Sequence, residues 1–438
     1  MSRHQVIEAD YTWLDGKFVA GVQITIDDSG RIAEVGIQGV AVDRRLRGQA
    51  VLPGFVNAHS HAFQRGLRGL GESFPGKAGN FWSWREAMYK LVETLDQELL
   101  YTLCRRAFDE MRAAGITAVG EFHYLHHLQI EQRDFAFDAV VLRAARDCGI
   151  RLVLLEAYYR TGGIGQPLTG GQRRFAVTSP KEYWHQIDRL AAQIDGPLQS
   201  LGAVAHSIRS VDRGEMAELH AEALRREMVF HAHLEEQRPE IDACREAYNA
   251  GPLAIISNDL EPGPEFTAVH CTHSTPEDLQ AFLANGANIC ICPLTEGNLG
   301  DGIANLPVML EHGGAICLGT DSNARISMTE ELRWLEYVQR LAGERRGVMT
   351  TPGGDCAARL LAAATSAGAR SLGLAAGAIE TGLWADLVAI DLAHPTLAGW
   401  TADSLAASLI LGGGDGAIAA TCIGGDWRTT AELYQPQL

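Results

Sequence analysis

The sequence predicts an α/β fold: a (β/α)8 TIM-like barrel with a small β-sandwich domain built from the N- and C-terminal segments. Three observations predict it. Short apolar, β-branched runs alternate with helix-like stretches through the middle of the 438-residue chain. Both ends of the chain alternate apolar and polar residues instead. Finally, histidines and carboxylates follow many of the runs, at the end where the strands of a barrel converge.

The two ends of the chain have a strand pattern. Residues 5–53 alternate apolar and polar side chains, with a turn at 28–30, which is typical of a β-meander. The same pattern returns at 385–391 and 418–422. Neither piece is long enough to form a stable sheet alone. We therefore predict one small β-domain from residues 1–53 and 380–438, beside a barrel domain of residues 54–379.

The apolar runs of the middle part are the predicted barrel strands. Helix-like stretches such as 97–114 and 330–341 separate them, and this alternation favours a parallel barrel over an open sheet. The eight runs are 51–58, 117–122, 151–157, 201–205, 228–232, 266–269, 287–292 and 315–318.

Four residues that follow these runs predict a metal site. His59 and His61 lie two residues apart, so both imidazoles can face the same side of a strand and reach one ion. His233 and Asp321 follow later runs and can supply the other ligands. Three histidines and one carboxylate suit one zinc ion per chain, or iron or manganese, with a position open for water. The alternative, that His231 and His233 are ordinary core histidines, leaves their placement at a strand end unexplained.

Composition excludes some classes of partner. The net charge of -17 argues against nucleic acid, although local arginines can still bind an anionic small molecule. No apolar run is long enough to span a bilayer, and residues 1–10 do not resemble a secretory signal. The nine cysteines form no C-x-x-C pair, so no disulfide framework or zinc knuckle is indicated. We expect a cytoplasmic protein.

Several segments resemble the amidohydrolase superfamily and, within it, the formimidoylglutamate deiminases of histidine degradation. The metal motifs indicate only the superfamily. The specific part is the tryptophan-rich segment 81–86 together with 121–127. The other matching segments are 56–65, 171–175, 206–209, 270–273, 296–302 and 331–337.

This resemblance implies a mononuclear zinc enzyme that hydrolyses N-formimino-L-glutamate to N-formyl-L-glutamate and ammonia. His59, His61, His233 and Asp321 would hold the metal. His270 would orient the hydroxide, Glu236 would move protons to the nitrogen, and Asp321 would also accept the proton of water. The chemistry agrees with these roles, because the nitrogen of the tetrahedral intermediate must be protonated before it leaves.

The resemblance also implies a substrate site for a small anionic dicarboxylate. Arginine suits this substrate because its planar fork can bind both oxygens of a carboxylate. The opposing interpretation is that the arginines neutralise acidic neighbours. A homodimer is also consistent with the superfamily. The implied substrate-binding residues are Gln64, Arg85, Tyr124, His206 and Arg209.

Two departures from the family pattern leave alternatives open. Asn323 stands where the relatives usually carry histidine, and residues 246–265 match poorly. If Asn323 touches the substrate, the preferred substrate can differ. A related deaminase of a heterocycle, such as guanine or an adenosine derivative, is therefore the second hypothesis. The third is a catalytically inactive binding or scaffolding protein, which would be expected to have lost a ligand or the Glu236 and His270 pair.

Overall fold

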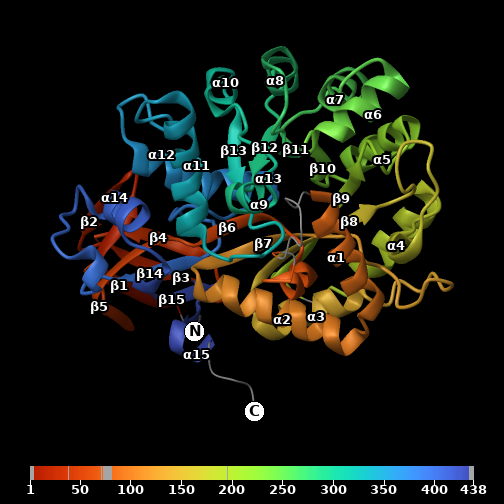
Figure 1. Ribbon diagram of the computed structural model, residues 1–438. Coiled ribbons are helices and arrows are strands. Elements are labelled where there is room, and N and C mark those ends of the chain that lie inside the picture. The colour runs from red at the N-terminus through yellow and green to blue at the C-terminus, as the bar shows by residue number, and fades with distance from the viewer. Residues whose placement is uncertain (1–3, 38, 71, 73–80, 195, 434–438) are drawn as a thin grey trace.

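The computed structural model describes residues 4–37, 39–70, 72, 81–194 and 196–433. Its centre is an eight-stranded parallel sheet in which each strand pairs with the next along the chain (Figure 1). The barrel predicted from the apolar runs is confirmed. Its strands are β6 (Phe55–Ser60), β7 (Ile116–His123), β8 (Arg151–Tyr158), β9 (Gln199–Ser207), β10 (Phe230–Leu234), β11 (Phe266–His270), β12 (Asn288–Ile291) and β13 (Ala315–Leu318).

The barrel closes between β6 and the segment that follows β13. The amide of Asp321 donates to the carbonyl of His59 (3.0 Å), and the amide of His61 donates to the carbonyl of Asp321 (2.9 Å). A parallel bridge between Ser60 and Asp321 lies at the same place. Predicted metal ligands therefore make the closure itself.

Helices cover the outside of the barrel (Figure 1). Several begin at a residue whose side chain accepts from the first turn, such as Asp96, Ser179 and Ser327, so the free amides of that turn are satisfied. The helices are α1 (Phe81–Thr94), α2 (Gln97–Ala113), α3 (Asp138–Cys148), α4 (Pro180–Ala191), α5 (Arg213–Arg225), α6 (Arg238–Tyr248), α7 (Pro252–Leu260), α8 (Pro276–Leu283), α9 (Pro293–Leu299), α10 (Leu306–Glu311), α11 (Met328–Gly343), α12 (Cys356–Ala363), α13 (Ser366–Ser371), α14 (Leu405–Ala407) and α15 (Thr430–Leu433).

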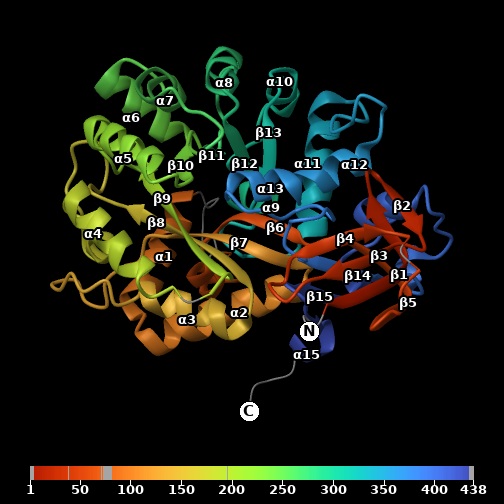
Figure 2. The same cartoon turned by 180° about the vertical axis from the view of Figure 1, so that it is seen from behind.

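The two ends of the chain pair into a second, mixed sheet beside the barrel (Figure 2). In this sheet β5 pairs parallel with β1 and antiparallel with β14, so it joins the N-terminal strands to the C-terminal ones. One face buries a core of its own, which includes Ile7, Ile24 and Leu387. The strands are β1 (Gln5–Leu14), β2 (Lys17–Ala20), β3 (Gln23–Ile26), β4 (Ile32–Gly36), β5 (Arg44–Pro53), β14 (Leu387–Asp391), β15 (Ile418–Ile423) and β16 (Asp426–Thr429). The pairing of the two ends is as predicted, and the boundaries at 53/54 and 379/380 stay predictions.

One predicted run belongs to both sheets. Residues 51–58 were expected to form a single barrel strand, but the chain passes from β5 to β6 at Gly54. A side chain at Gly54 would meet the Thr117 side chain on β7, since a Cβ would lie 2.1 Å from Thr117 Oγ1. The change of sheet therefore depends on a close approach that only glycine allows.

A buried ion pair connects the barrel to the terminal sheet. Arg151 on β8 donates from Nε to Asp386 Oδ2 (2.6 Å) and from Nη2 to Asp386 Oδ1 (3.0 Å). The guanidinium also lies 4.2 Å from the ring centre of Trp384. Within the described residues, no helix is both long and apolar enough to cross a membrane.

Candidate active site

The four predicted metal ligands meet at the carboxyl ends of the barrel strands. One ligand atom from each of His59, His61, His233 and Asp321 lies within 4.8 Å of the others, and all four residues are buried. The Nε2 atom of His233 lies 3.2 Å from that of His59 and 3.4 Å from that of His61. Oδ1 of Asp321 lies 3.3 Å from both His59 Nε2 and His61 Nε2. Donor atoms at these separations fit around one ion with bonds of about 2.0–2.1 Å.

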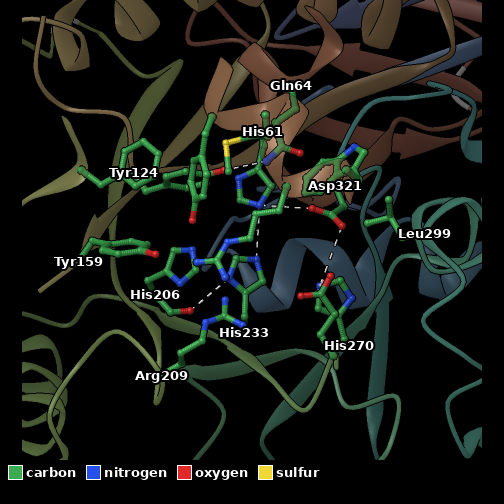
Figure 3. A pocket seen from close by; sticks show the side chains of 16 residues that line it. His61, Gln64, Tyr124, Tyr159, His206, Arg209, His233, His270, Leu299 and Asp321 are labelled. Atoms are coloured by element: carbon green, nitrogen blue, oxygen red, sulfur yellow. Dashed lines mark hydrogen bonds and ion pairs between the residues drawn. The ribbon is translucent and has the colours of Figure 1, made fainter. Parts of the chain in front are cut away.

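In His61 and His233, the hydrogen bond made by Nδ1 determines that Nε2 faces the ion. His61 Nδ1 donates to the carbonyl of Phe122 (2.8 Å), and His233 Nδ1 donates to the carbonyl of His206 (3.1 Å). A carbonyl only accepts, so the proton stays on Nδ1 and the lone pair of Nε2 is free for a metal. Figure 3 shows His61, His233 and Asp321 pointing toward one another.

Burial and the contacts among these ligands together keep them in the protonation states that a metal needs. It lowers the pKa of His59, His61 and His233, that of His61 to about 3, so the imidazoles are neutral. Burial raises the pKa of Asp321, but the contact with His59 outweighs this effect and the pKa is lowered overall. Neutral histidines and an ionised carboxylate are the metal-binding forms. The residues present therefore fit a divalent ion.

Asn323 lies behind the ligands rather than in the pocket. Its Nδ2 lies within hydrogen-bond distance of Ser60 Oγ (3.1 Å) and of the carbonyls of His61 (3.0 Å) and Asp321 (3.1 Å). Its Oδ1 accepts from Thr320 Oγ1 (2.7 Å). The side chain is fully buried and is not among the residues that line the pocket. The departure from the family pattern at this position therefore lies at the closure of the barrel, outside the residues that line the pocket.

The predicted catalytic residues lie beside the ligands. Nε2 of His270 is 3.9 Å from Glu236 Oε1 and 4.0 Å from Asp321 Oδ2. Burial raises the pKa of Glu236, although the nearby His270 opposes this effect. Burial lowers the pKa of His270, but Glu236 and Glu296 offset this and raise it to about 10. A proton donor and an acceptor thus lie within a few ångströms of the ligand cluster.

Glu296 is a site residue that the sequence analysis did not assign. Its Oε1 lies 3.3 Å from His270 Nδ1 and accepts from the amide of Cys292 (3.0 Å). Glu296 thereby orients the imidazole of His270. Its position directly after the strand run 287–292 was the signal in the sequence that could have found it.

The predicted substrate residues line one cavity of about 520 Å³, its open mouth included, together with the catalytic residues and the ligands His61, His233 and Asp321. Gln64, in the short helix η1 (Ala62–Leu67), donates from Nε2 to Tyr124 Oη (2.7 Å). Among the described residues, Gln64 Oε1 and Arg209 Nε are buried without a hydrogen-bond partner. Both atoms are therefore available to a polar ligand. All five predicted substrate residues line the cavity: Gln64, Arg85, Tyr124, His206 and Arg209.

The cavity is lined by two arginines and by an apolar, largely aromatic wall. Arg85 comes from α1 and lies 5.3 Å from the ring centre of Tyr89, while Arg209 follows β9 and lies half-buried near Glu236 and Glu240. The sequence analysis did not assign the apolar wall, because its residues lie in helices and loops outside the strand runs, where nothing in the sequence shows which side chains face a cavity. The other lining residues are Trp84, Met88, Tyr89, Tyr159, Phe175 and Leu299.

Comparison with known proteins agrees with this geometry. Residues 50–428 match the model of the amidohydrolase family. The chain belongs to this family. This amidohydrolase is 36% identical over 427 residues to a formimidoylglutamate deiminase of Pseudomonas aeruginosa, covering 96% of this chain and 94% of the relative. The resemblance predicted from the sequence is confirmed.

Two further comparisons place the amidohydrolase among its relatives. It is 27% identical over 354 residues to a 5-methylthioadenosine/S-adenosylhomocysteine deaminase of Haloquadratum walsbyi, covering 80% of this chain and 73% of the relative. The crystal structure of an amidohydrolase from Brucella melitensis superposes with a TM-score of 0.89 at 30% identity, covering 97% of this chain and 94% of that one.

Proposed function

We propose that this amidohydrolase is a zinc-dependent deiminase that hydrolyses N-formimino-L-glutamate to N-formyl-L-glutamate and ammonia, in histidine degradation. The observation that carries the proposal is the cavity, in which Arg85 and Arg209 accompany the ligand cluster and the Glu236 and His270 pair. The similarity over nearly the whole chain to a formimidoylglutamate deiminase supports it.

His59, His61, His233 and Asp321 would hold one zinc ion in the active site, with iron or manganese as the alternatives. When bound, the ion would act as a Lewis acid that polarises the C=N bond of the substrate, and it would make hydroxide available near neutral pH. The low pKa of Asp321 keeps its carboxylate ionised. The ionised carboxylate is the group that we assign to accept the proton that water loses as it attacks.

Glu236 is the residue suited to move protons to the departing nitrogen. Attack of water on the C=N carbon leaves a tetrahedral centre whose former imino nitrogen must gain protons to leave as ammonia. Burial raises the pKa of Glu236, so this carboxyl can carry a proton and transfer it. His270, held by Glu296, can hydrogen-bond to the attacking oxygen and keep it aligned.

Two arginines, together with the uncharged side chains of His206 and Tyr124, are suited to bind the two carboxylates of the substrate. Arg85 and Arg209 supply the positive charge. Burial and Arg209 lower the pKa of His206, so this ring is neutral and offers one N–H. Burial also raises the pKa of Tyr124, whose hydroxyl stays protonated and can donate. Gln64 Oε1, without a partner of its own, can accept from the formimino N–H.

A deaminase of a heterocycle is the second candidate. The aromatic side chains of Trp84, Tyr159 and Phe175 in the cavity wall favour it, because they can stack on a planar ring. The 27% identical relative named for two adenosine derivatives points the same way. The positive charge of Arg85 and Arg209 in the cavity argues for the dicarboxylate, since a neutral heterocycle offers no carboxylate to either guanidinium.

Product identification tests the proposal. Zinc-loaded protein incubated with N-formimino-L-glutamate is expected to give N-formyl-L-glutamate and ammonia, both identified by NMR. The Asp321→Asn variant is expected to lose activity by about 100-fold or more, because a ligand and proton acceptor is gone. Free glutamate as the product, or normal activity in the variant, would contradict the proposal. The cytoplasmic location and the homodimer stay predictions, and sedimentation of the purified protein checks the dimer.

A further inference from the structure

A second cluster of metal-binding side chains lies in the barrel wall, apart from the active-site ligands. It consists of His123 at the end of β7, His126 in the following loop, Asp138 at the start of α3 and Glu156 on β8. One ligand atom from each residue lies within 4.8 Å of the others, and all four side chains are buried. None of the four lines the active-site cavity.

The separations in this cluster resemble those in the active site. Oδ1 of Asp138 lies 3.0 Å from His123 Nε2 and 3.1 Å from His126 Nδ1. Oε1 of Glu156 lies 3.3 Å from His126 Nδ1. A tetrahedral zinc ion with bonds of about 2.0–2.1 Å has ligand edges of roughly 3.3–3.4 Å. Small outward movements would therefore seat an ion between these atoms.

Neighbouring groups orient the donor atoms inward. His126 Nε2 donates to the carbonyl of Ala157 (2.8 Å), so the lone pair of this imidazole can lie on Nδ1, inside the cluster. Gln186 Nε2 donates to Asp138 Oδ2 (2.6 Å) and leaves Oδ1 facing both histidines. Ligands held by a hydrogen bond on their outer side are typical of metal sites.

The carboxylate of Glu156 is a second, independent observation that points to a cation at this cluster. Both of its carboxylate oxygens are buried, and among the described residues neither accepts a hydrogen bond. A buried carboxylate without donors is costly unless it is protonated or meets a cation. Its Oε1 lies 3.3 Å from the inner nitrogen of His126, so the carboxylate points into the cluster.

We propose that His123, His126, Asp138 and Glu156 bind a second divalent metal ion, for which zinc fits the donor set best. Two neutral imidazoles and two carboxylates neutralise a divalent ion and satisfy the buried oxygens of Glu156. Four protein donors leave no position for water, so this ion is structural. The resemblance implies one ion per chain, and this site goes beyond it and beyond the proposed function.

The second ion would hold part of the active-site wall. Tyr124, which lines the cavity, lies in the short segment between His123 and His126. The amides of His126 and His127 donate to the carbonyl of Arg174 (3.1 and 3.0 Å), next to Phe175 of the same cavity. An ion bound to His123 and His126 therefore fixes both sides of Tyr124.

A proton is the competing occupant. Burial lowers the pKa of His126, but Glu156 and Asp138 more than offset this and raise it to about 10. An imidazolium between two carboxylates would then replace the metal. The number of metal ions bound per chain distinguishes the two occupants, because a zinc ion adds one equivalent of metal and a proton adds none.

The test measures zinc per chain after loading with zinc and gel filtration. The unaltered protein is expected to retain about two equivalents. The His126→Asn variant is expected to retain about one, and the His59→Asn/His61→Asn double variant, which loses two active-site ligands, also about one. The matched control is His127→Asn, since His127 is the neighbouring buried histidine and bonds to Ala176 and Phe135 instead. It is expected to keep two.

One equivalent in the unaltered protein, or two in His126→Asn, would overturn the proposal and leave the proton as the occupant. The double variant decides the matter if His126→Asn does not fold, because its cluster is intact. Zinc X-ray absorption of that variant is expected to show four N/O ligands and no sulfur. Absence of bound zinc in the double variant would equally overturn the site. None of these readouts depends on activity, so failure here does not touch the proposed deiminase.

Discussion

Arg209 shows how much a single residue of the site depends on its surroundings. The residue is half-buried, and its Nε atom is buried without a hydrogen-bond partner among the described residues. Glu240 and Glu236 keep its pKa high despite burial. The sequence could predict that an arginine follows the strand, and the family resemblance indicated its role. It could not indicate the free Nε or the nearby Glu240, because both depend on the packing of three separate segments.

The Arg209→Ala variant is expected to bind substrate less well. Loss of a buried charge-assisted contact costs about 2–5 kcal/mol, which is roughly 30-fold or more in kcat/KM. Ammonia release at varied N-formimino-L-glutamate concentration measures the effect, which we expect mainly in KM. Arg173→Ala is the control, since Arg173 is partly exposed and pairs with Glu131 outside the cavity. Equal kcat/KM in both variants would remove Arg209 from the substrate site.

The barrel strands are the elements that the sequence predicts well, because apolar, β-branched runs report burial directly. The departures are informative. The first run is divided at Gly54, where close packing against Thr117, not apolarity, decides the boundary. The segment after β13 has no strand pattern, yet Asp321 and Asn323 complete the barrel there with positive φ angles of 44° and 54°. Backbone strain of this kind is held by surrounding contacts and leaves no periodicity in the sequence.

The Asn323→Ala variant tests the closure. Removal of the amide leaves the Thr320 hydroxyl without its acceptor and takes one donor from the carbonyls of His61 and Asp321, which keep their backbone donors. A buried polar group left unpaired costs about 1–3 kcal/mol. We expect a lower unfolding temperature and faster loss of active-site metal to a chelator, with KM nearly unchanged. The control is Asn305→Ala, whose side chain caps no backbone group. A raised KM with unchanged stability would instead put Asn323 in contact with the substrate.

At the scale of the whole molecule, the two sheets are joined through β5 and through Arg151 and Asp386. The alternating patterns at both ends predicted that the ends pair with each other. They did not predict the ion pair, because its partners are far apart in the sequence and neither lies in a recognisable motif. Asp386 also accepts from the amide of Gly424 (3.0 Å), so one carboxylate contacts the barrel and the C-terminal strands at once.

The Asp386→Ala variant is expected to be markedly less stable. Removing one partner of a buried ion pair costs about 3–5 kcal/mol, since the other charge stays buried. Urea unfolding measures the free energy. Glu131→Ala is the control, because Glu131 and Arg173 are both exposed and their ion pair should contribute at most about 1 kcal/mol. Similar losses in the two variants would show that the Arg151 contact does not hold the sheets together.

The most direct test of the account is a comparison of kcat/KM for ammonia release from four substrates by the zinc-loaded protein. The substrates are N-formimino-L-glutamate, its aspartate analogue, guanine and 5-methylthioadenosine. The account predicts that N-formimino-L-glutamate is preferred over every other compound, because Arg85 and Arg209 in the cavity match its two carboxylates. A higher kcat/KM for either heterocycle would contradict the account and assign the cavity to a planar ring.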